Sequence, residues 1–197
     1  RTYPNFIKLL DQIGCSGTPS EMSFSLRDEN KNFEYNGHNI DTLFAQRINC
    51  LNPKFWMMIR DILRFNKMAK ILNPTSDQSL EDFMTEHRFS DVFKTRYLYP
   101  MAAAIWSTGD KAIGDFPIRS LADFFVNHGL VDLKNRPQWY VVAGGSNQYV
   151  GKIADTLTDI RVNCPVQRVS RQDGSVTVTS SVGDEVFDQV IFACHSD

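Results

Sequence analysis

The sequence predicts an α+β fold, with a mixed, largely antiparallel sheet and a helical insertion of roughly residues 38–137. Short strand-like runs bounded by turn signals occur near both ends of the chain. Between them, apolar residues recur at helical spacing from residue 40 to about residue 130. A chain of 197 residues is long enough for one sizeable domain or two small ones, and it can bury a core without disulfides.

The first elements are a helix and a hairpin. Apolar residues at helical spacing predict a helix over residues 3–14, which Gly14 closes. Residues 21–26 and 33–35 have the alternating polar and apolar pattern of strands, and Asp28-Glu29-Asn30 lies between them as a turn. We therefore expect an antiparallel hairpin directly after the first helix.

The helical insertion begins with a long amphipathic helix. Pro53 stands at a favourable first helical position, and Asn73-Pro74 ends the helix. The apolar stripe of this helix comprises Phe55, Trp56, Ile59, Ile62 and Leu63. One such stripe indicates that one side of the helix packs against a core.

Shorter helices follow. Ser79 and Ser90 are predicted N-caps, because a hydroxyl before an apolar helical run can accept a backbone N–H bond. Pro100 opens a further helix that reaches Trp106. The last helix of the insertion is expected from Arg119 to His128, with Gly129 at its end.

After Pro137 the residue pattern changes from helical to largely strand-like. A strand over Trp139–Val142, an Ala143-Gly144-Gly145 turn and a helix over residues 146–157 are expected in that order. Four short strands follow, over residues 160–163, 166–171, 176–179 and 187–193. Asp173-Gly174 is a strong hairpin signal between the second and third of these strands.

Composition narrows the function classes. Twenty-one Lys and Arg against 23 Asp and Glu give a net charge of −2, which argues against a broad basic surface for nucleic acid. No apolar run is long enough for a membrane span. The four cysteines are widely spaced and form no CxxC pair, so we expect a reducing, cytoplasmic environment.

Both ends suggest a middle piece of a larger protein. The chain opens inside an amphipathic helix, and it closes on an apolar strand, residues 187–193, that arrives at a turn. A central strand normally has neighbours on both edges. We therefore expect further chain on either side, and a complete small domain with a buried last strand is the alternative. The oligomeric state stays open.

The Gly144-Gly145 turn is the most suggestive local site. Two glycines permit positive φ and close backbone approach, and the helix start behind them favours an anion or an electron-rich ring. A nucleophile elbow is excluded because Gln148 replaces the last glycine. A phosphate loop is excluded by its spacing and by Ile153 at the Ser/Thr position. A plain strand-to-helix turn remains the alternative.

No metal site or catalytic constellation is predicted. Cys164, Cys194 and His195 fit no zinc spacing and read as ordinary side chains at strand ends. No carboxylate pair, Cys–His dyad or Ser–His–Asp order stands out, so the catalytic residues are unknown. If the chain takes part in catalysis, a cofactor supplies the reactive chemistry.

Two surfaces have open interpretations. One side of the long helix carries Arg60, Arg64 and Lys67, either as a solvated face or as a contact for anionic lipid or a partner surface. Aromatic residues are dense in the helical insertion. Most belong to the core, but some are candidates for the lining of an apolar ligand cavity.

The order of motifs in the last third resembles a known family. Three motifs follow one another along the chain: Cys164-Pro165-Val166-Gln167-Arg168-Val169, Asp173-Gly174-Ser175-Val176-Thr177-Val178 and Phe187-Asp188-Gln189-Val190-Ile191-Phe192-Ala193. This run is similar to that of FAD-dependent amine oxidases, phytoene desaturases and protoporphyrinogen oxidases. The Gly144-Gly145 turn and the helix behind it resemble the glycine pair just upstream in that superfamily.

The whole chain most resembles one branch, the bacterial predicted NAD/FAD-binding proteins described as flavin-containing amine oxidases. The matching stretches are Tyr3–Phe6, Ser20–Ser25, Tyr99–Ser107, Asn127–Leu130 and Arg136–Trp139. The N-terminal G-x-G-x-x-G Rossmann fingerprint of such proteins is missing from this chain. The resemblance thus implies the substrate domain of a flavin amine oxidase-like fold, over residues 1–137, and a strand-rich part, over residues 138–197, that joins the FAD-binding domain.

The resemblance implies FAD in the parent protein, and a fragment that is without cofactor and inactive when isolated. It assigns Val166 to the adenine edge, and Ala193 and Cys194 to the neighbourhood of the dinucleotide. Many relatives have proline where this chain has His195. Gly144, Gly145 and Trp139 are expected near the flavin ring.

Aromatic density suggests Tyr97, Met101 and Trp106, together with Trp139, as the substrate-binding residues. The expected reaction is oxidation of a C–N or C–C bond in a small apolar or amphipathic substrate. The alternatives are a non-catalytic flavin-binding or docking module and a membrane-surface lipid oxidoreductase.

Overall fold

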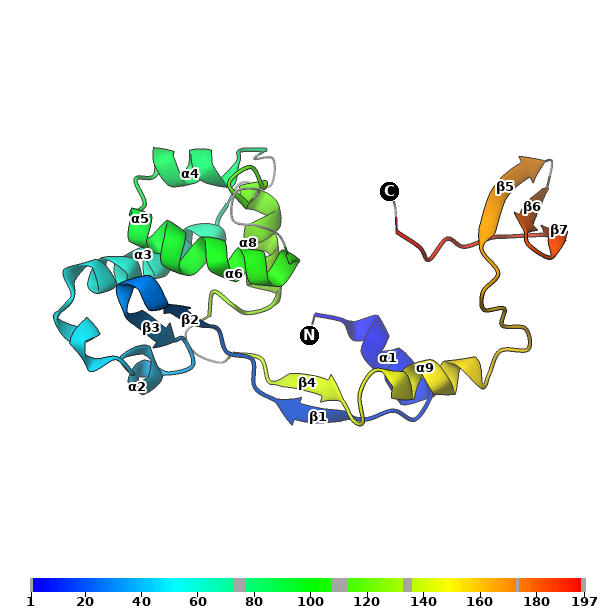
Figure 1. Ribbon diagram of the computed structural model, residues 1–197, viewed down its shortest axis with the longest axis horizontal. Coiled ribbons are helices and arrows are strands. Elements are labelled where there is room, and N and C mark those ends of the chain that lie inside the picture. Colours follow the sequence, from blue (N-terminus) through cyan, green and yellow to red (C-terminus); the bar gives the residue numbers. More distant parts are fainter. Residues whose placement is uncertain (1, 73–76, 108–112, 133–135, 173, 196–197) are drawn as a thin grey trace. The chain divides into compact units, whose positions relative to one another are not determined.

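A computed structural model describes residues 2–72, 77–107, 113–132, 136–172 and 174–195 (Figure 1). These residues fall into two compact units, Arg1–Gly145 and Ser146–Asp197. Each unit is described by itself. The division at residue 137 expected from the sequence stays a prediction, although the strand at Trp139–Val142 pairs within the first unit.

The first unit begins with α1, Pro4–Gln12, followed by Gly14 at a φ of 65°. The strand β1, Gly17–Ser20, then pairs antiparallel with β4, Trp139–Val142, in the register Gly17↔Val142. The predicted helix and the predicted strand at 139–142 are confirmed. β1 was not predicted, because Gly17 and Pro19 give it the composition of a turn.

The predicted hairpin is also confirmed. β2, Ser25–Asp28, pairs antiparallel with β3, Phe33–Asn36. A short 3₁₀ helix, η1, Glu29–Lys31, connects them, and the Asp28 side chain accepts from the Lys31 N–H at 3.2 Å. The first strand begins at Ser25 rather than at Glu21.

The chain between β3 and β4 is helical wherever it forms regular secondary structure among the described residues. They are α2 (Ile40–Leu43), η2 (Arg47–Leu51), α3 (Pro53–Ala69), α4 (Leu80–Glu86), α5 (Asp91–Phe93), the π-helical η3 (Lys94–Leu98), α6 (Tyr99–Trp106) and α8 (Ile118–Asn127). The predicted caps are confirmed, because Ser79 and Ser90 accept bonds from the backbone N–H groups of Asp82 and Phe93. The predicted stop at Asn73-Pro74 lies outside the described residues.

Two apolar clusters hold the first unit together. The larger joins α3, α4, α5, α6 and α8 and contains the fully buried Phe65, Phe93 and Phe125. The smaller packs the β2–β3 hairpin on α3 through Phe33, Tyr35, Phe55 and Met58. Burial of large aromatic side chains supplies most of the stabilisation in such a core.

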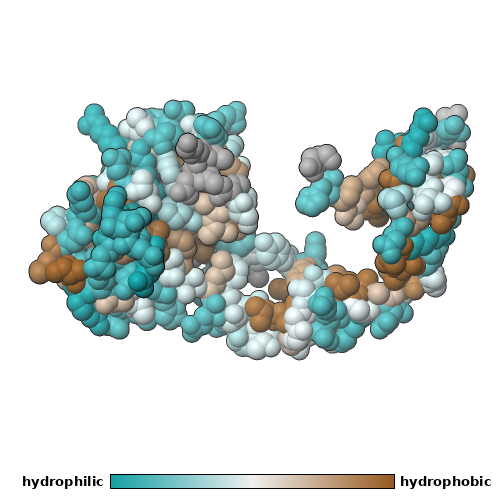
Figure 2. All heavy atoms as spheres, in the orientation of Figure 1, coloured by the Kyte–Doolittle hydropathy of each residue, from teal (hydrophilic) through white to brown (hydrophobic). Residues whose placement is uncertain are grey.

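The second unit contains α9, Asn147–Ala154, and an antiparallel meander of β5, Val166–Gln172, β6, Ser175–Ser180, and β7, Gly183–Phe187. None of its described residues is fully buried. Figure 2 shows hydrophobic side chains lying open among hydrophilic ones there.

Three expectations about strands were wrong. Residues 160–163 form no strand, and the last strand ends at Phe187, so residues 188–193 are irregular. Ile191 is 91% exposed, because no described strand of this unit pairs with the segment. The expected single mixed sheet is instead three separate sheets among the described residues, each of them antiparallel.

Candidate active site in an aromatic pocket

An apolar pocket of about 350 Å³ opens in the first unit, between α1, the β1–β4 ribbon and the end of α8. α1 contributes Phe6, Ile7 and Leu10, and β4 contributes Trp139–Val142. The described lining contains no Asp, Glu, Lys or Arg. A pocket of this size and chemistry suits a small, mostly apolar ligand with few polar groups.

His128 is the main polar group of the pocket, and its ring is held in one orientation. Its Nδ1 lies 2.8 Å from the Phe124 carbonyl oxygen, so Nδ1 carries the proton and donates there. Its Nε2 lies 3.1 Å from the Tyr3 hydroxyl oxygen, within hydrogen-bond distance. His128 is only 7% exposed. Both ring nitrogens are thus engaged, and the imidazole is fixed at the wall of the pocket.

An aromatic row connects two of the predicted substrate residues. Trp106 lies 5.0 Å from Phe124, Phe124 stacks on His128 at 3.8 Å, and His128 stacks on Trp139 at 6.0 Å between ring centroids. Trp106 also packs on Phe116 at 4.8 Å. Trp139 lines the pocket itself, whereas Trp106 supports the row from the helical side.

Tyr97 and Met101 lie elsewhere in the first unit. Tyr97 stacks on Phe93 at 5.6 Å and meets Phe24 edge-on at 6.4 Å. Burial raises the pKa of Tyr97 to about 12, against the opposing charge of Arg136. Met101 packs against the larger apolar cluster. Neither residue lines the aromatic pocket, and their assignment to a substrate site stays a prediction.

The predicted cofactor residues divide between the units. Gly144 and Gly145 form the turn after β4 with φ values of 75° and 90°, a conformation that favours glycine. Val166 begins β5 and is 58% exposed, and Ala193 and Cys194 are exposed as well. Residues 189–194 make no backbone–backbone hydrogen bond among the described residues.

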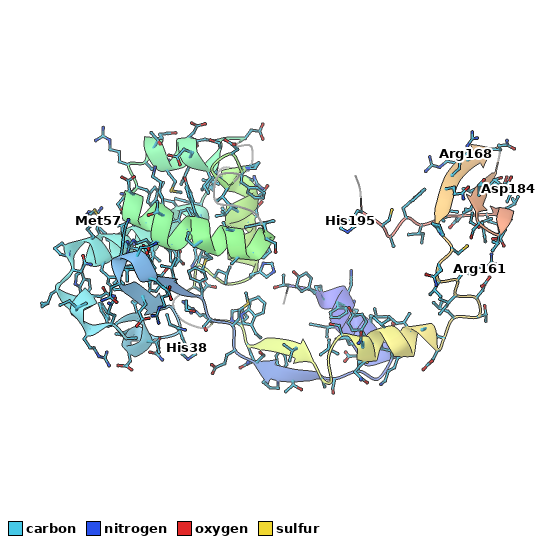
Figure 3. The ribbon with its side chains drawn as sticks, viewed as in Figure 1. His38, Met57, Arg161, Arg168, Asp184 and His195 are labelled. Atoms are coloured by element: carbon cyan, nitrogen blue, oxygen red, sulfur yellow. The ribbon has the colours of Figure 1, made fainter. Side chains whose placement is uncertain are left out.

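Several charged residues of the second unit form surface contacts with one another or with neighbouring side chains. Arg161 donates to Asp159 at 2.6 Å and to Glu185 at 2.5 Å, and Asp184 accepts from Thr179 at 2.6 Å. Figure 3 shows His195 on the segment beyond β7, away from Arg161 and Asp184. The Ser181 hydroxyl donates to the Cys164 Sγ at 3.5 Å.

The suggested cationic face of α3 is only partly free. Arg64 donates to the His87 carbonyl oxygen at 2.5 Å and lies 3.9 Å above the Phe89 ring. Arg60 and Arg64 both approach the buried Asp61 carboxylate, at 3.2 and 3.7 Å. Lys67 is exposed. The two arginines therefore help to hold α3 against its neighbours. Separately, no helix among the described residues is long and apolar enough to cross a bilayer.

The sequence matches the family model of flavin-containing amine oxidoreductases over residues 1–197. The chain belongs to this family. A comparison with curated proteins found no match to the chain.

Solved structures agree with this family at the level of the fold. Two are variants, a double and a triple mutant, from a structure-based redesign of cofactor binding in putrescine oxidase. They share 17% and 18% sequence identity with this chain, both at a TM-score of 0.60, and cover 90% and 91% of it. The chain spans only 41% and 42% of the length of these two structures.

Sequence reasoning found Trp139 but missed its neighbours Tyr3 and His128. Tyr3 directly precedes a helix, and His128 directly precedes the helix-ending Gly129. The sequence therefore indicated only a helix boundary at each position. Their contact joins positions 125 residues apart. Only the β1–β4 pairing and the packing of α1 bring them together, and no local pattern records that.

Proposed function

We propose that the full-length protein containing this chain is an FAD-dependent oxidoreductase, for which the chain supplies the substrate-binding part. The observation that carries this proposal is the aromatic pocket on Trp139 and His128, in a chain of the flavin-containing family. FAD, when bound, supplies the hydride-accepting ring. The substrate loses a hydride equivalent from a C–N or C–C bond.

The residues of the pocket orient the substrate and exclude water. The flat face of Trp139 and the apolar surface of α1 favour an apolar or amphipathic molecule. The contacts of His128 with Tyr3 and Phe124 hold the imidazole in place at the wall of the pocket. Tyr97, Met101 and Trp106 remain proposed substrate residues of the same domain.

Cofactor contacts are proposed at the two glycines of the turn after β4 and at exposed backbone of the second unit. Gly144, Gly145, Val166, Ala193 and Cys194 would hold FAD through main-chain groups, together with parts of the protein outside this chain. The isolated chain is therefore proposed to be inactive and free of cofactor. Its four free thiols support a reducing, cytoplasmic location.

Two alternatives make different predictions. A non-catalytic flavin-binding or docking module would use the same fold without turnover. A membrane-surface lipid oxidoreductase would need a free cationic face on α3, which the engagement of Arg60 and Arg64 with Asp61 disfavours.

The test is a visible absorption spectrum of the purified full-length gene product. We expect a flavin spectrum that bleaches under anaerobic reductant, followed by turnover in a substrate screen from amines to unsaturated lipids. Within that protein, Trp139→Leu should lower kcat/KM at least about tenfold, because the pocket loses its main aromatic face.

The matched control is Trp56→Leu, which removes an indole on α3 that is 50% exposed and lies outside the pocket. It should leave kcat/KM within about twofold of the wild type. A colourless protein that takes up no added FAD would overturn the oxidoreductase proposal. Equal effects of the two variants would contradict the pocket assignment alone.

A further inference from the structure

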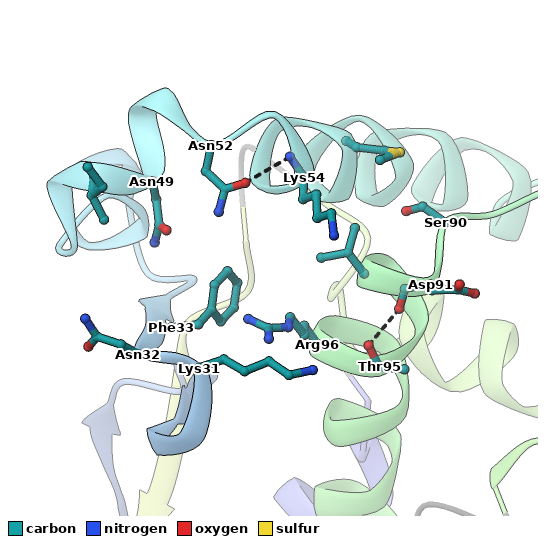
Figure 4. A pocket seen from close by; sticks show the side chains of 13 residues that line it. Lys31, Asn32, Phe33, Asn49, Asn52, Lys54, Ser90, Asp91, Thr95 and Arg96 are labelled. Carbon is teal, nitrogen blue, oxygen red and sulfur yellow. Dashed lines mark hydrogen bonds between the residues drawn. The ribbon is translucent and has the colours of Figure 1, made fainter.

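A second pocket, of about 600 Å³, lies on the first unit between the β2–β3 hairpin, the start of α3 and the α5–η3 segment (Figure 4). Its chemistry is the opposite of the aromatic pocket. Lys31 of η1, Lys54 of α3 and Arg96 of η3 all line it, from three separate elements. In Figure 4 the two lysine side chains reach toward the space from the hairpin and from α3, with Arg96 lying between them.

The cations of this pocket outnumber its carboxylates. Asp91 is the one acidic residue in the described lining, and its side chain is 95% exposed. Among the described residues, neither Lys31 nor Lys54 has a carboxylate oxygen within 4.0 Å, although other lysines of the unit are paired. Like charges that converge without counter-charges repel one another, so this arrangement favours uptake of an anion.

Arg96 is fixed before any ligand arrives. Its Nη2 lies 3.1 Å from the Asp28 carboxylate, and its Cζ lies 4.1 Å from the centre of the Phe33 ring. The Arg96 side chain is only 16% exposed. Because Asp28 offsets part of this charge, the two lysines carry the excess. A guanidinium fixed in this way loses little conformational entropy when its remaining N–H groups bind a ligand.

Neutral donors complete the pocket. The Asn52 Oδ1 accepts from the Lys54 backbone N–H at 3.0 Å, which leaves the amide Nδ2 as a donor. The positive end of the α3 dipole starts at the same position and adds to the field of the lysines. Ser90 and Thr95 also line the pocket, and the Thr95 hydroxyl already donates to the Asp91 carbonyl oxygen at 2.7 Å.

We propose that this pocket binds a small, multiply charged oxyanion, one with two or more phosphate or carboxylate groups. Three cations on separate elements suit a ligand whose charges are spread over several groups better than they suit a single halide. The site is separate in residues from the aromatic pocket. It therefore does not depend on the proposed oxidoreductase function.

The test is isothermal titration of the chain with inorganic pyrophosphate, and then with citrate, at low ionic strength. We expect saturable binding at one site per chain. The double variant Lys31→Gln, Lys54→Gln should weaken it at least tenfold while leaving the far-ultraviolet circular dichroism unchanged. Preference for pyrophosphate over citrate would identify a phosphate ligand, and the reverse a carboxylate ligand.

The control is the double variant Lys8→Gln, Lys67→Gln, which removes the same net charge at exposed lysines outside the pocket. Its dissociation constant should stay within twofold of the wild type. No saturable binding of either anion would overturn the proposal. Equal weakening by the two double variants would also overturn it, because it would show a general charge effect.

Discussion

At the scale of single residues, Asp61 shows how α3 is tied to the helices it packs against. Its Oδ2 accepts from the Ser90 N–H at 2.9 Å, and Arg60 lies 3.2 Å from its Oδ1. Burial raises the pKa of Asp61, but hydrogen bonds from Ser90 and Arg60 outweigh that effect and hold the pKa below its usual range. The ionised carboxylate therefore stabilises the fold.

We expect Asp61→Asn to lower the free energy of unfolding by about 2–3 kcal/mol at pH 7, because charge-assisted bonds to a buried group are lost. The folded pKa lies below the unfolded value of about 3.9, so this contribution is present above that value and is lost as pH falls through the folded pKa. Urea unfolding at several pH values measures it, and the exposed Asp11→Asn is the control. A difference between variant and wild type that stays constant down to pH 2 would contradict the assignment.

At the scale of elements, the end of α8 depends on Gly129. This residue has a φ of 69°, and the next residue, Leu130, donates to the Phe125 carbonyl oxygen at 2.8 Å. A Cβ atom there would lie 2.6 Å from the Pro137 Cδ. The turn also directs His128 to its position in the aromatic pocket.

Gly129→Ala should therefore cost roughly 1–3 kcal/mol of unfolding free energy, because alanine is strained at positive φ and also meets Pro137. Gly37→Ala is the matched control within the same unit. Its Cβ would lie 3.5 Å from the Phe24 carbonyl oxygen, an ordinary contact. Thermal unfolding followed by circular dichroism compares them. Equal midpoints for the two variants would show that the α8 end tolerates a side chain.

At the scale of the whole molecule, the two units differ in how much they bury. The first has fully buried side chains on α3, α4 and α8, whereas no described residue of the second is fully buried. We expect backbone amides of α3 and α8 to exchange with solvent at least about 100-fold more slowly than those of β5–β7 in the isolated chain. Hydrogen exchange read by mass spectrometry measures this, with β2–β3 as the internal reference for a small sheet that has a core. Equal protection in the two units would mean that the second is covered in solution by another surface.

Local structure was predictable because its causes are local. The helix starts at Pro53, Ser79 and Ser90 depend on caps and on the fixed φ of proline within a few residues. The hairpin of β2 and β3 depends on its turn and its alternating side chains. The apolar pattern placed the larger core in the helical insertion, but the predicted stripe of α3 was partly wrong. Trp56 and Leu63 of that stripe are 50% and 39% exposed, whereas Met58 and Phe65, which it left out, are fully buried.

Sheet partners and the pocket were not predictable in the same way. β1 became a strand only because β4 lies beside it, and the segment after Phe187 stayed irregular because no described strand pairs with it. Trp139 was singled out from the sequence, but Tyr3 and His128 were not. The sequence by itself determined the helices, their caps, the hairpin and the family. Only the tertiary structure decided the sheet partners and the two pockets, because each joins residues distant in the chain whose interactions exist only once the chain has folded.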